Sequence, residues 1–472
     1  MTVAWTRGGP DLLVALDRGA GPLRTQLQDQ LRAAIRDRRL GAGERLPSTR
    51  RLAELLGVAR GTVVDVYEQL LAEGYVESVV GSGTRVAAMP TGRPVRHPPG
   101  AGPAPAPEVD FEYGIPDLGS VPLTAWSWAV AEATRTLPTA ELGDEDPAGS
   151  RHLRAVVTAY HRRVRSGCAV AEDAVVVSGF RQGLAFALAT LARHGIRRIA
   201  LEDPGPREQD VIARRAGLDA VPVPVDADGL DVGRLRETGA RAVLVTPAHQ
   251  CPTGVALGPS RRRDLIAWAG EVDGVILEDD YDAEFRYDRQ PVGSLQGLDP
   301  ARVIALGSVS KTLAPAIRLG WVLAPARFVA GIVEEKRLSC RGAPGLDQEA
   351  LALLMESGRF DRHLRRVREI YRARRDVLAA EAELAFGPDR LPGPAAGCHA
   401  LLQLPDGTSE RAVVATAATM GVRVNGLGHY RVGATDDLRP PALVLGFGNV
   451  TEHQISRGIR ILAEAVRRHT AR

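Results

Sequence analysis

A stretch rich in proline, glycine and alanine at residues 89–108 sets the strongest limit on how this chain can fold. Such a composition forms an extended, semi-rigid linker and buries no core of its own. The residues before and after it must therefore fold as separate units. We expect a small N-terminal domain over residues 1–88, a linker over 89–108 and a large domain over 109–472.

The composition is that of an ordinary folded protein. Of the 472 residues, 44% are hydrophobic and 25% are charged, and no apolar run approaches the roughly 18 residues that a membrane span needs. The N-terminus has no charged-then-apolar signal pattern, so we expect a cytoplasmic protein with no membrane partner. The four scattered cysteines fit neither a zinc pattern nor a disulfide framework, and no metal site is expected. Because the net charge is only +3, nucleic-acid binding would require a local basic patch.

The N-terminal unit shows three helical patterns followed by a hairpin. Leucine or isoleucine recurs every four residues between positions 23 and 35, which predicts a first helix. Ser48 is a suitable N-cap for a second, short helix, and an apolar face predicts a third over about 60–73. Two extended runs around a turn at 81–83 predict a β-hairpin. Three helices and a hairpin in this order describe a winged helix-turn-helix.

The third of these helices is the expected DNA-recognition helix. A recognition helix needs short or basic side chains on its exposed N-terminal face, where they reach base edges in the major groove. Arg60 and Thr62 occupy that face. Arg50 and Arg51 near the start of the preceding helix, and Arg85 on the wing, are placed for phosphate contacts. We therefore expect double-stranded DNA as a partner; the alternative is a solvated basic helix pair.

Residues 109–472 alternate between short β-branched runs and helical patterns. The runs include Ala174–Val177, Ala242–Val245 and residues 303–306, and helical patterns such as 182–192 and 261–268 lie between such runs. This alternation predicts an α/β fold in which helices cover both faces of a parallel or mixed sheet.

Lysine is almost absent from the chain. Of the 60 basic residues, only Lys311 and Lys336 are lysines. Arginine replaces lysine as a charge but not as an amine nucleophile, because the guanidinium stays protonated. A lysine that persists in such a composition is a candidate for covalent chemistry. Lys311 lies in a suitable motif, whereas Lys336 is expected to be an ordinary surface residue.

The segment around Lys311 supplies what a pyridoxal-phosphate (PLP) site needs. Such a site uses a lysine amine to form a Schiff base, and cations or hydroxyls to hold the phosphate. Ser308, Ser310 and Arg318 flank the lysine. Further upstream, residues 178–180 precede a helix whose first N–H groups can also seat a phosphate.

An acidic cluster follows the strand expected at 274–277. It includes Asp279 and Tyr281. A carboxylate at a strand end can keep the pyridine nitrogen of PLP protonated, and a nearby tyrosine can bond the ring hydroxyl. By itself an acidic cluster is more often a solvated turn, and a lone lysine is more often a surface residue. The order and combination of these elements make the set specific.

Both units resemble known families. The run at 43–50 (Gly-Glu-Arg-Leu-Pro-Ser-Thr-Arg) and the residues that follow to Tyr75 are similar to the GntR-type winged helix. The large domain resembles the fold-type I aminotransferases, as found in the MocR regulators. The matching runs are residues 247–254, 278–285 and 308–320. This resemblance implies a large PLP-transferase domain with a mixed sheet, a small C-terminal α+β subdomain and a head-to-tail homodimer.

The resemblance also assigns roles to individual residues. It implies Lys311 as the catalytic, Schiff-base lysine, Asp279 as the partner of the pyridine nitrogen and Tyr281 as the partner of the ring oxygen. His249 would lie beside the ring. The phosphate would be held by Arg318, Ser308, Ser310, Ser178, Gly179 and Phe180.

Four positions depart from the family patterns, one of them Cys251, which stands where relatives carry an aromatic residue or an asparagine. Ala59 stands where GntR-type proteins usually place a serine N-cap, the loss of which costs about 0.5–2 kcal/mol. Pro206 replaces a tyrosine that stacks on the cofactor, and Asp144 replaces a tyrosine that reaches the phosphate of the partner subunit. An aspartate there would repel the phosphate. Both changes weaken the expected grip on PLP.

An effector would need its own anchor in the large domain. For the carboxylate of an amino-acid effector, Arg439 is the first candidate and Arg207 the second.

Three functions remain open at this stage. The first is a DNA-binding regulator whose large domain senses PLP or a small amine or amino acid. The second is a working PLP-dependent aminotransferase with an appended DNA-binding module. The third is a repressor that keeps the fold only for dimerisation. The winged helix is nearly intact whereas the cofactor site has two altered positions, which favours the regulator with weak or no transaminase turnover.

Overall fold

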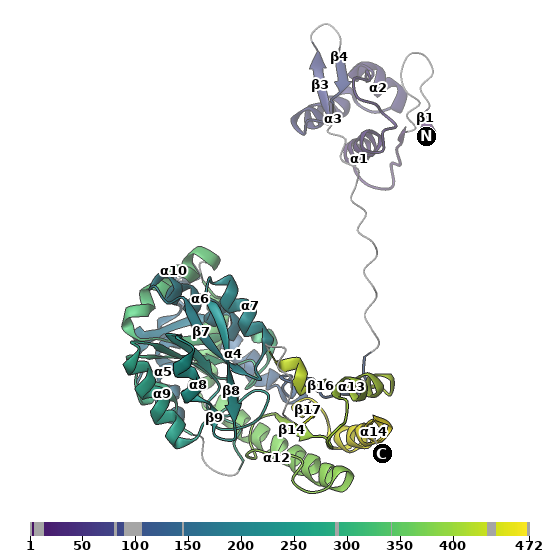
Figure 1. The fold of residues 1–472 in the computed structure, drawn as a ribbon. Helices are drawn as coiled ribbons and strands as arrows, with labels where there is room; N and C mark the ends of the chain where they lie inside the picture. The colour runs from purple at the N-terminus through teal and green to yellow at the C-terminus, as the bar shows by residue number, and fades with distance from the viewer. Residues whose placement is uncertain are drawn as a thin grey trace. The chain divides into compact units, whose positions relative to one another are not determined.

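The computed structural model describes residues 2–3, 14–79, 83–88, 106–143, 146–287, 292–340, 342–431 and 440–469. The chain separates into two compact units, Met1–Ala104 and Pro105–Arg472, which are shown in Figure 1. The turn residues Gly81 and Ser82, Asp144, Arg439 and most of the expected linker lie outside the described residues.

The first unit is a winged helix-turn-helix, as predicted (Figure 1). Its core consists of leucine, valine and alanine side chains from all three helices and the hairpin. The N-cap Ser48 accepts a hydrogen bond from the Arg51 N–H at 3.2 Å, and Gly57 ends the second helix in the left-handed conformation, where glycine carries no Cβ penalty. Its elements are α1 (Leu23–Arg36), α2 (Thr49–Leu56), α3 (Arg60–Ala72), β3 (Val76–Val79) and β4 (Gly83–Val86), with the short pair β1 (Thr2–Val3) and β2 (Val14–Ala15).

The second unit is built on a mixed eight-stranded sheet, which confirms the predicted α/β class. The strand β13 runs antiparallel to both of its neighbours, β6 and β12, while the central strands are parallel. The order is β6 (Ala174–Val177), β13 (Gly320–Leu323), β12 (Val303–Ser308), β11 (Val275–Asp280), β10 (Ala242–Val245), β7 (Arg198–Asp203), β8 (Asp219–Asp226) and β9 (Gly229–Leu230).

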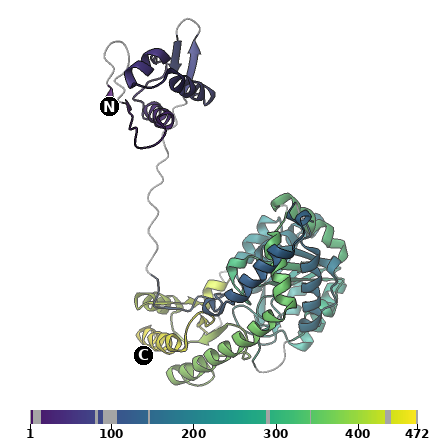
Figure 2. The same cartoon turned by 180° about the vertical axis from the view of Figure 1, so that it is seen from behind.

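Helices cover both faces of this sheet (Figures 1 and 2). Side chains of β6 alternate between the two faces: Val175 and Val177 pack with one helical layer, whereas Ala174 and Val176 pack with the other. Strands buried on both faces explain the continuous apolar runs of the sequence. The main helices are α4 (Leu123–Thr136), α5 (Arg151–Arg165), α6 (Phe180–Arg193), α7 (Arg207–Arg215), α8 (Val232–Glu237), α9 (Pro259–Glu271), α10 (Ala326–Cys340) and α11 (Gly345–Glu356).

A smaller α+β subdomain follows the long helix α12 (Arg359–Phe386), as predicted (Figure 2). Its three-stranded sheet has the order β14 (His399–Gln403), β17 (Ala442–Gly446), β16 (Asn425–Gly426). The helices α13 (Glu410–Thr419) and α14 (Glu452–His469) belong to it, and β15 (Val422–Arg423) pairs with β5 (Val109–Asp110). Across the described residues, no helix combines the length and apolarity that crossing a membrane requires.

The expectation that Lys336 is a surface residue is wrong. Its side chain is fully buried on α10, where the helix packs against α6. A lysine stem of four methylenes can be buried among apolar side chains, and a periodic pattern does not reveal on which face of α10 it falls.

Candidate cofactor site and DNA-binding face

A cavity of about 380 Å³ opens where β11 and β12 end. Ligands of open α/β sheets bind beyond the carboxyl ends of the strands. Most of the predicted cofactor residues line this cavity together: Lys311, Asp279, Tyr281, Arg318, Ser308, Ser310 and Phe180. Segments up to 205 residues apart in the sequence, from Tyr113 to Arg318, thus meet at one place.

Lys311 lies in the turn that follows β12. Its ammonium group donates to the Gly114 carbonyl and lies 5.7 Å from the centre of the Tyr113 ring. Gly114 has a φ of 86°, and a Cβ there would come within 2.7 Å of the lysine Nζ. The positive φ therefore favours glycine beside the amine. Tyr113 and Gly114 were not predicted as site residues, because nothing in the sequence relates them to a lysine almost 200 positions away.

Polar groups suited to an anion gather around Arg318 and Ser308. Ser308 Oγ donates to Ser310 Oγ at 2.9 Å, and Arg318 Nη2 donates to the Ser178 carbonyl at 2.8 Å. Gly179 is the N-cap of α6 and has a φ of 88°. A Cβ added at this position would lie 3.8 Å from both Ser308 Oγ and Arg318 Nη1. A helix N-terminus, two hydroxyls and a guanidinium together form a seat for a phosphate.

Asp279 and Tyr281 line the same cavity. Burial, with the neighbouring Asp280 and Asp282, raises the pKa of Asp279 well above its usual value, and Lys311 partly offsets this. The Tyr281 hydroxyl donates to the main-chain carbonyl of His249 at 2.7 Å. A buried carboxyl of this kind suits a protonated ring nitrogen, whose positive charge would stabilise the carboxylate.

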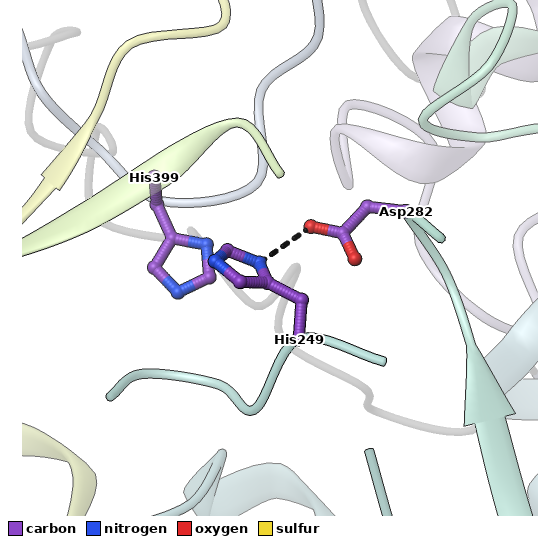
Figure 3. A group of neighbouring side chains, drawn as sticks. All are labelled: His249, Asp282 and His399. Carbon is purple, nitrogen blue, oxygen red and sulfur yellow. Dashed lines mark hydrogen bonds and ion pairs between the residues drawn. The ribbon is translucent and has the colours of Figure 1, made fainter. Parts of the chain in front are cut away.

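The His249 side chain does not line the cavity. Its Nδ1 lies 2.9 Å from Asp282 Oδ2, and its ring packs against that of His399 (Figure 3). Burial lowers the pKa of His249 to about 3, so the ring is neutral. Ser178 and Gly179 are also not among the residues that line the cavity.

A buried carboxyl supports the turn that carries His249. Glu202, at 5% exposure, accepts hydrogen bonds from Thr246 Oγ1 at 2.6 Å, from the Thr246 N–H at 3.2 Å and from Gln250 Nε2 at 3.3 Å. Burial raises its pKa to about 7.

Of the two alternative effector arginines, the structure describes only Arg207. Arg439 lies outside the described residues. Arg207 is exposed in the first turn of α7, directly after Pro206, which does line the cavity. Pro206 therefore lines the cavity at the position where, by the family resemblance, relatives carry an aromatic residue.

The predicted DNA contacts all lie on the first unit, with differing exposure. Arg50, Arg51 and Arg60 are exposed, while Thr62 and Arg85 are half-buried. Arg50 reaches Glu54 at 3.3 Å. Ala59 caps α3 without any side-chain hydrogen bond.

Arg85 on the wing has a basic neighbour, Arg45, that was not predicted as a DNA contact. Arg85 Nη1 donates to the Gly43 carbonyl at 2.9 Å, so part of its guanidinium is engaged within the fold. Arg45 is exposed and pairs with Arg85 through an isolated β-bridge. Its guanidinium would lie 3.5 Å from a Cβ on Gly83, which places a second cation at the wing.

Comparisons with known proteins agree with both units. The profile of the bacterial regulatory proteins of the gntR family matches residues 23–86. The chain is 33% identical to the pyridoxine biosynthesis transcriptional regulator PdxR of Corynebacterium glutamicum, over 94% of this chain and 95% of that protein. It is also 33% identical to the probable rhizopine catabolism regulatory protein MocR of Rhizobium meliloti, over 78% of this chain and 79% of that protein.

Among solved structures, the second unit is similar to a kynurenine aminotransferase of Pyrococcus horikoshii, determined in complex with PMP. The TM-score is 0.69 at 22% identity, over 76% of this chain and 91% of that one. This likeness shows an aminotransferase-like fold.

Proposed function

This chain belongs to the MocR family of HTH-type transcription regulators, in which a GntR-type winged helix precedes an aminotransferase-like domain, and we propose that its large domain binds PLP at Lys311. The bound PLP, or an amine or amino acid that reacts with it, then sets the affinity of the winged helix for operator DNA.

The observation that carries this proposal is one cavity whose lining includes the Lys311 amine, the cation and hydroxyls of Arg318, Ser308 and Ser310, and the pair Asp279 and Tyr281. When bound, PLP supplies an aldehyde that condenses with amines and a ring that withdraws electrons. Lys311 holds the cofactor covalently. Arg318, with Ser308 and Ser310, neutralises the phosphate, and Asp279 keeps the ring nitrogen protonated while Tyr281 donates to the ring oxygen.

Weak or absent transaminase turnover forms part of the proposal. Pro206 lines the cavity and offers a small saturated ring where an aromatic would stack on the cofactor. Asp144 brings a negative charge where the family places a phosphate donor. Catalysis requires the reacting groups to be held tightly, whereas a sensor needs only to bind. A carboxylate of an amino-acid effector would pair with Arg439 or Arg207.

Dimerisation through the large domain completes the proposal. Leu142 and Leu346 are 62% and 37% exposed, and both line a groove of about 880 Å³ beside α11. Exposed apolar side chains that share a groove mark interaction surfaces. A head-to-tail homodimer would bury them and present two winged helices to double-stranded DNA in the cytoplasm.

The test uses the small number of lysines. Wild-type protein, Lys311→Ala and Lys311→Arg are mixed with PLP, reduced with borohydride and dialysed. Only the wild type should retain a visible or reduced-cofactor absorbance, and proteolysis should place the modification on the peptide with Lys311. Lys311→Arg keeps the charge without the nucleophile and controls for non-covalent binding. Retention of the label in Lys311→Ala would refute the site.

Operator binding supplies the second half of the test. The affinity for operator DNA is measured with and without PLP, in the wild type and in Lys311→Ala. A ligand shifts an equilibrium only by its differential affinity for the two states. If the affinities with and without PLP are equal in the wild type, and stay equal with candidate amines added, the large domain is a dimerisation scaffold and not a sensor.

A further inference from the structure

Outside the cofactor cavity, one buried cluster of ionisable side chains joins the small subdomain to the large one. His249, Asp282 and His399 offer ligand-type atoms that all lie within 4.8 Å of one another, the sole group of this kind within the described ranges. All three are almost completely buried. His249 follows β10, Asp282 directly follows Tyr281, and His399 begins β14 of the small subdomain (Figure 3).

The cluster is linked to the proposed cofactor contact Tyr281. A phenolic hydroxyl has one proton to donate. In this structure, Tyr281 donates it to the His249 carbonyl at 2.7 Å, although the same proton is needed for the ring oxygen of PLP. The position of the His249 carbonyl therefore decides how strongly it competes for that proton.

His249 is held on several sides. Its Nδ1 pairs with Asp282 at 2.9 Å, and a Cβ on Gly254 would approach its Nε2 to 3.2 Å. A Cβ on Gly397 would overlap both the His249 ring and Asp282. Gly397 in turn donates its N–H to the Phe285 carbonyl at 2.6 Å. A shift of the small subdomain at 397–399 is thus passed directly to His249.

His399 touches His249 and also the surroundings of Lys311. The rings of His399 and His249 are 4.4 Å apart between centroids, and the edge of Tyr113 packs against His399 at 4.9 Å. Tyr113 lies below the Lys311 ammonium. His399 thereby contacts the neighbours of both proposed cofactor groups without reaching the cavity itself.

Burial of the His399 imidazole is energetically unfavourable. Neither ring nitrogen meets hydrogen-bond geometry among the described residues. Main-chain groups of Pro252 and Gln250 lie near enough to offset only part of the effect of burial, which lowers the pKa of His399 well below its usual value. A phenyl ring would fill the same space without desolvating two polar atoms. Main-chain groups of Pro252 and Gln250 in the 249–252 turn thus interact with the imidazole, which packing alone would not require.

We propose that His399 is a positioning residue for the cofactor: through the polar nitrogens of its imidazole it holds the 249–252 turn in place, and so sets how the Tyr281 proton is divided between the His249 carbonyl and the cofactor ring oxygen. Movement of the small subdomain thereby changes the electronic state of the bound ring. This inference rests on the proposed binding of PLP at Lys311.

A metal ion is the other candidate occupant of the cluster. Two histidines and a carboxylate are suitable ligands for transition metals. In this structure, however, Asp282 and His249 Nδ1 are bonded to each other, and the two imidazole rings pack against each other with an interplanar angle of 51°. The geometry therefore favours the positioning role, and the test below measures metal directly.

The test compares His399→Phe with the wild type by following the visible absorbance of the PLP complex from pH 5 to 10. Freed from the fixed carbonyl, Tyr281 should donate more fully to the ring oxygen, which stabilises its anion. The pKa of the Schiff-base linkage should fall by about half a unit or more, and the affinity for PLP should change by about threefold or more. His399→Asn, which keeps a polar side chain at the turn, should restore much of the wild-type pKa.

Leu402→Ala is the matched control. Leu402 lies on the same strand, but in the main core rather than beside Tyr281. This variant should lower the thermal stability of the PLP-free protein without moving the pKa. If the pKa of His399→Phe stays the same or rises, the positioning role is refuted. Stoichiometric zinc in the purified wild type, lost in His399→Phe, would also refute it. A wild type that forms no Schiff base would instead refute the proposed function itself.

Discussion

At the scale of single residues, burial raises the pKa values of three acidic side chains in and near the candidate cofactor cavity. The pKa of Glu202 rises to about 7, and those of Asp279 and Asp282 rise well above their usual values. Lys311 lowers the pKa of both aspartates. A cationic ring bound against Asp279 would therefore lower the free-energy cost of ionising this buried carboxyl group.

Glu202 allows a pH-dependence prediction. Its folded pKa of about 7 exceeds the ordinary value of 4.5, so its contribution to stability is full below about pH 4.5 and is lost as the pH rises through 7. Glu202→Gln keeps an acceptor oxygen for Thr246 and Gln250 and cannot ionise. The free energy of unfolding of the variant relative to wild type should rise between pH 4.5 and 8, by at most about 3 kcal/mol.

Denaturant titrations at several pH values measure this difference. Glu383→Gln, at an exposed position of α12, is the control and should follow the wild-type curve. A constant difference between Glu202→Gln and wild type across this range would show that Glu202 does not titrate as inferred.

Arg318 allows a second prediction at this scale. Charge-assisted hydrogen bonds are worth about 1.5–3 kcal/mol, so Arg318→Ala should weaken PLP binding roughly tenfold to a hundredfold. Binding of pyridoxal, which has no phosphate, should change little. Arg181→Ala is the control, because Arg181 lines the same cavity but is 67% exposed and pairs with Glu208. Equal losses for PLP and pyridoxal would place Arg318 away from the phosphate.

At the scale of elements, the two helices of the helix-turn-helix differ in how they begin. Ser48 caps α2 through its side chain, whereas Ala59 leaves the first N–H groups of α3 without a side-chain partner. The start of the recognition helix is therefore less firmly held than the start of the helix before it.

Exchanging the caps tests this difference. Ser48→Ala should destabilise the start of α2, and Ala59→Ser should stabilise the start of α3, each by about 1 kcal/mol. Amide hydrogen exchange of the full chain, followed by mass spectrometry, reports both. Unchanged protection at α3 in Ala59→Ser would mean that the serine does not adopt the capping conformation.

The same helices separate base contacts from phosphate contacts. Arg60→Ala should cost about 1–3 kcal/mol on the operator and relax sequence preference. Arg50→Ala should weaken binding to all sequences alike and lower the salt slope by roughly one. Neither change should alter the absorbance of the PLP complex. Titrations of operator and scrambled DNA at several salt concentrations distinguish the two, and identical behaviour of both variants would contradict this assignment.

The limits of sequence reasoning are visible in particular elements. The helices of the first unit and the strands β6, β10 and β12 were predictable because their apolar patterns are regular. The strand β8 was missed because Pro222 and Pro224 argue against a strand; both point to its exposed face. The strand β13 was also missed: its residues Gly320–Leu323 directly follow the motif around Lys311.

Contacts between segments that are distant in the sequence could not be predicted either. Lys311, Asp279 and Tyr281 were identified by residue type and motif. The roles of Tyr113 and His399 depend on how separate segments pack, which no local pattern records.

At the scale of the whole molecule, the proposed dimer should determine how DNA is bound. Leu142 and Leu346 line one groove, and burying such side chains contributes roughly 1.5–3 kcal/mol each. Replacing both by aspartate should convert a dimer into a monomer in light scattering at micromolar concentration. Two winged helices per dimer should bind half-sites about one or more helical turns apart, each turn roughly 34 Å of duplex.

The double variant should therefore lose affinity for the two-half-site operator while keeping that for an isolated half-site, because linked binding gains from a high effective concentration. Leu384→Asp, on α12 at 84% exposure and away from the groove, should behave as wild type and excludes a general effect of added charge. A wild type that is monomeric, or that binds a single half-site with full affinity, would contradict the dimer. A wild-type dimer that survives Leu142→Asp with Leu346→Asp would place the interface on another face of the large domain.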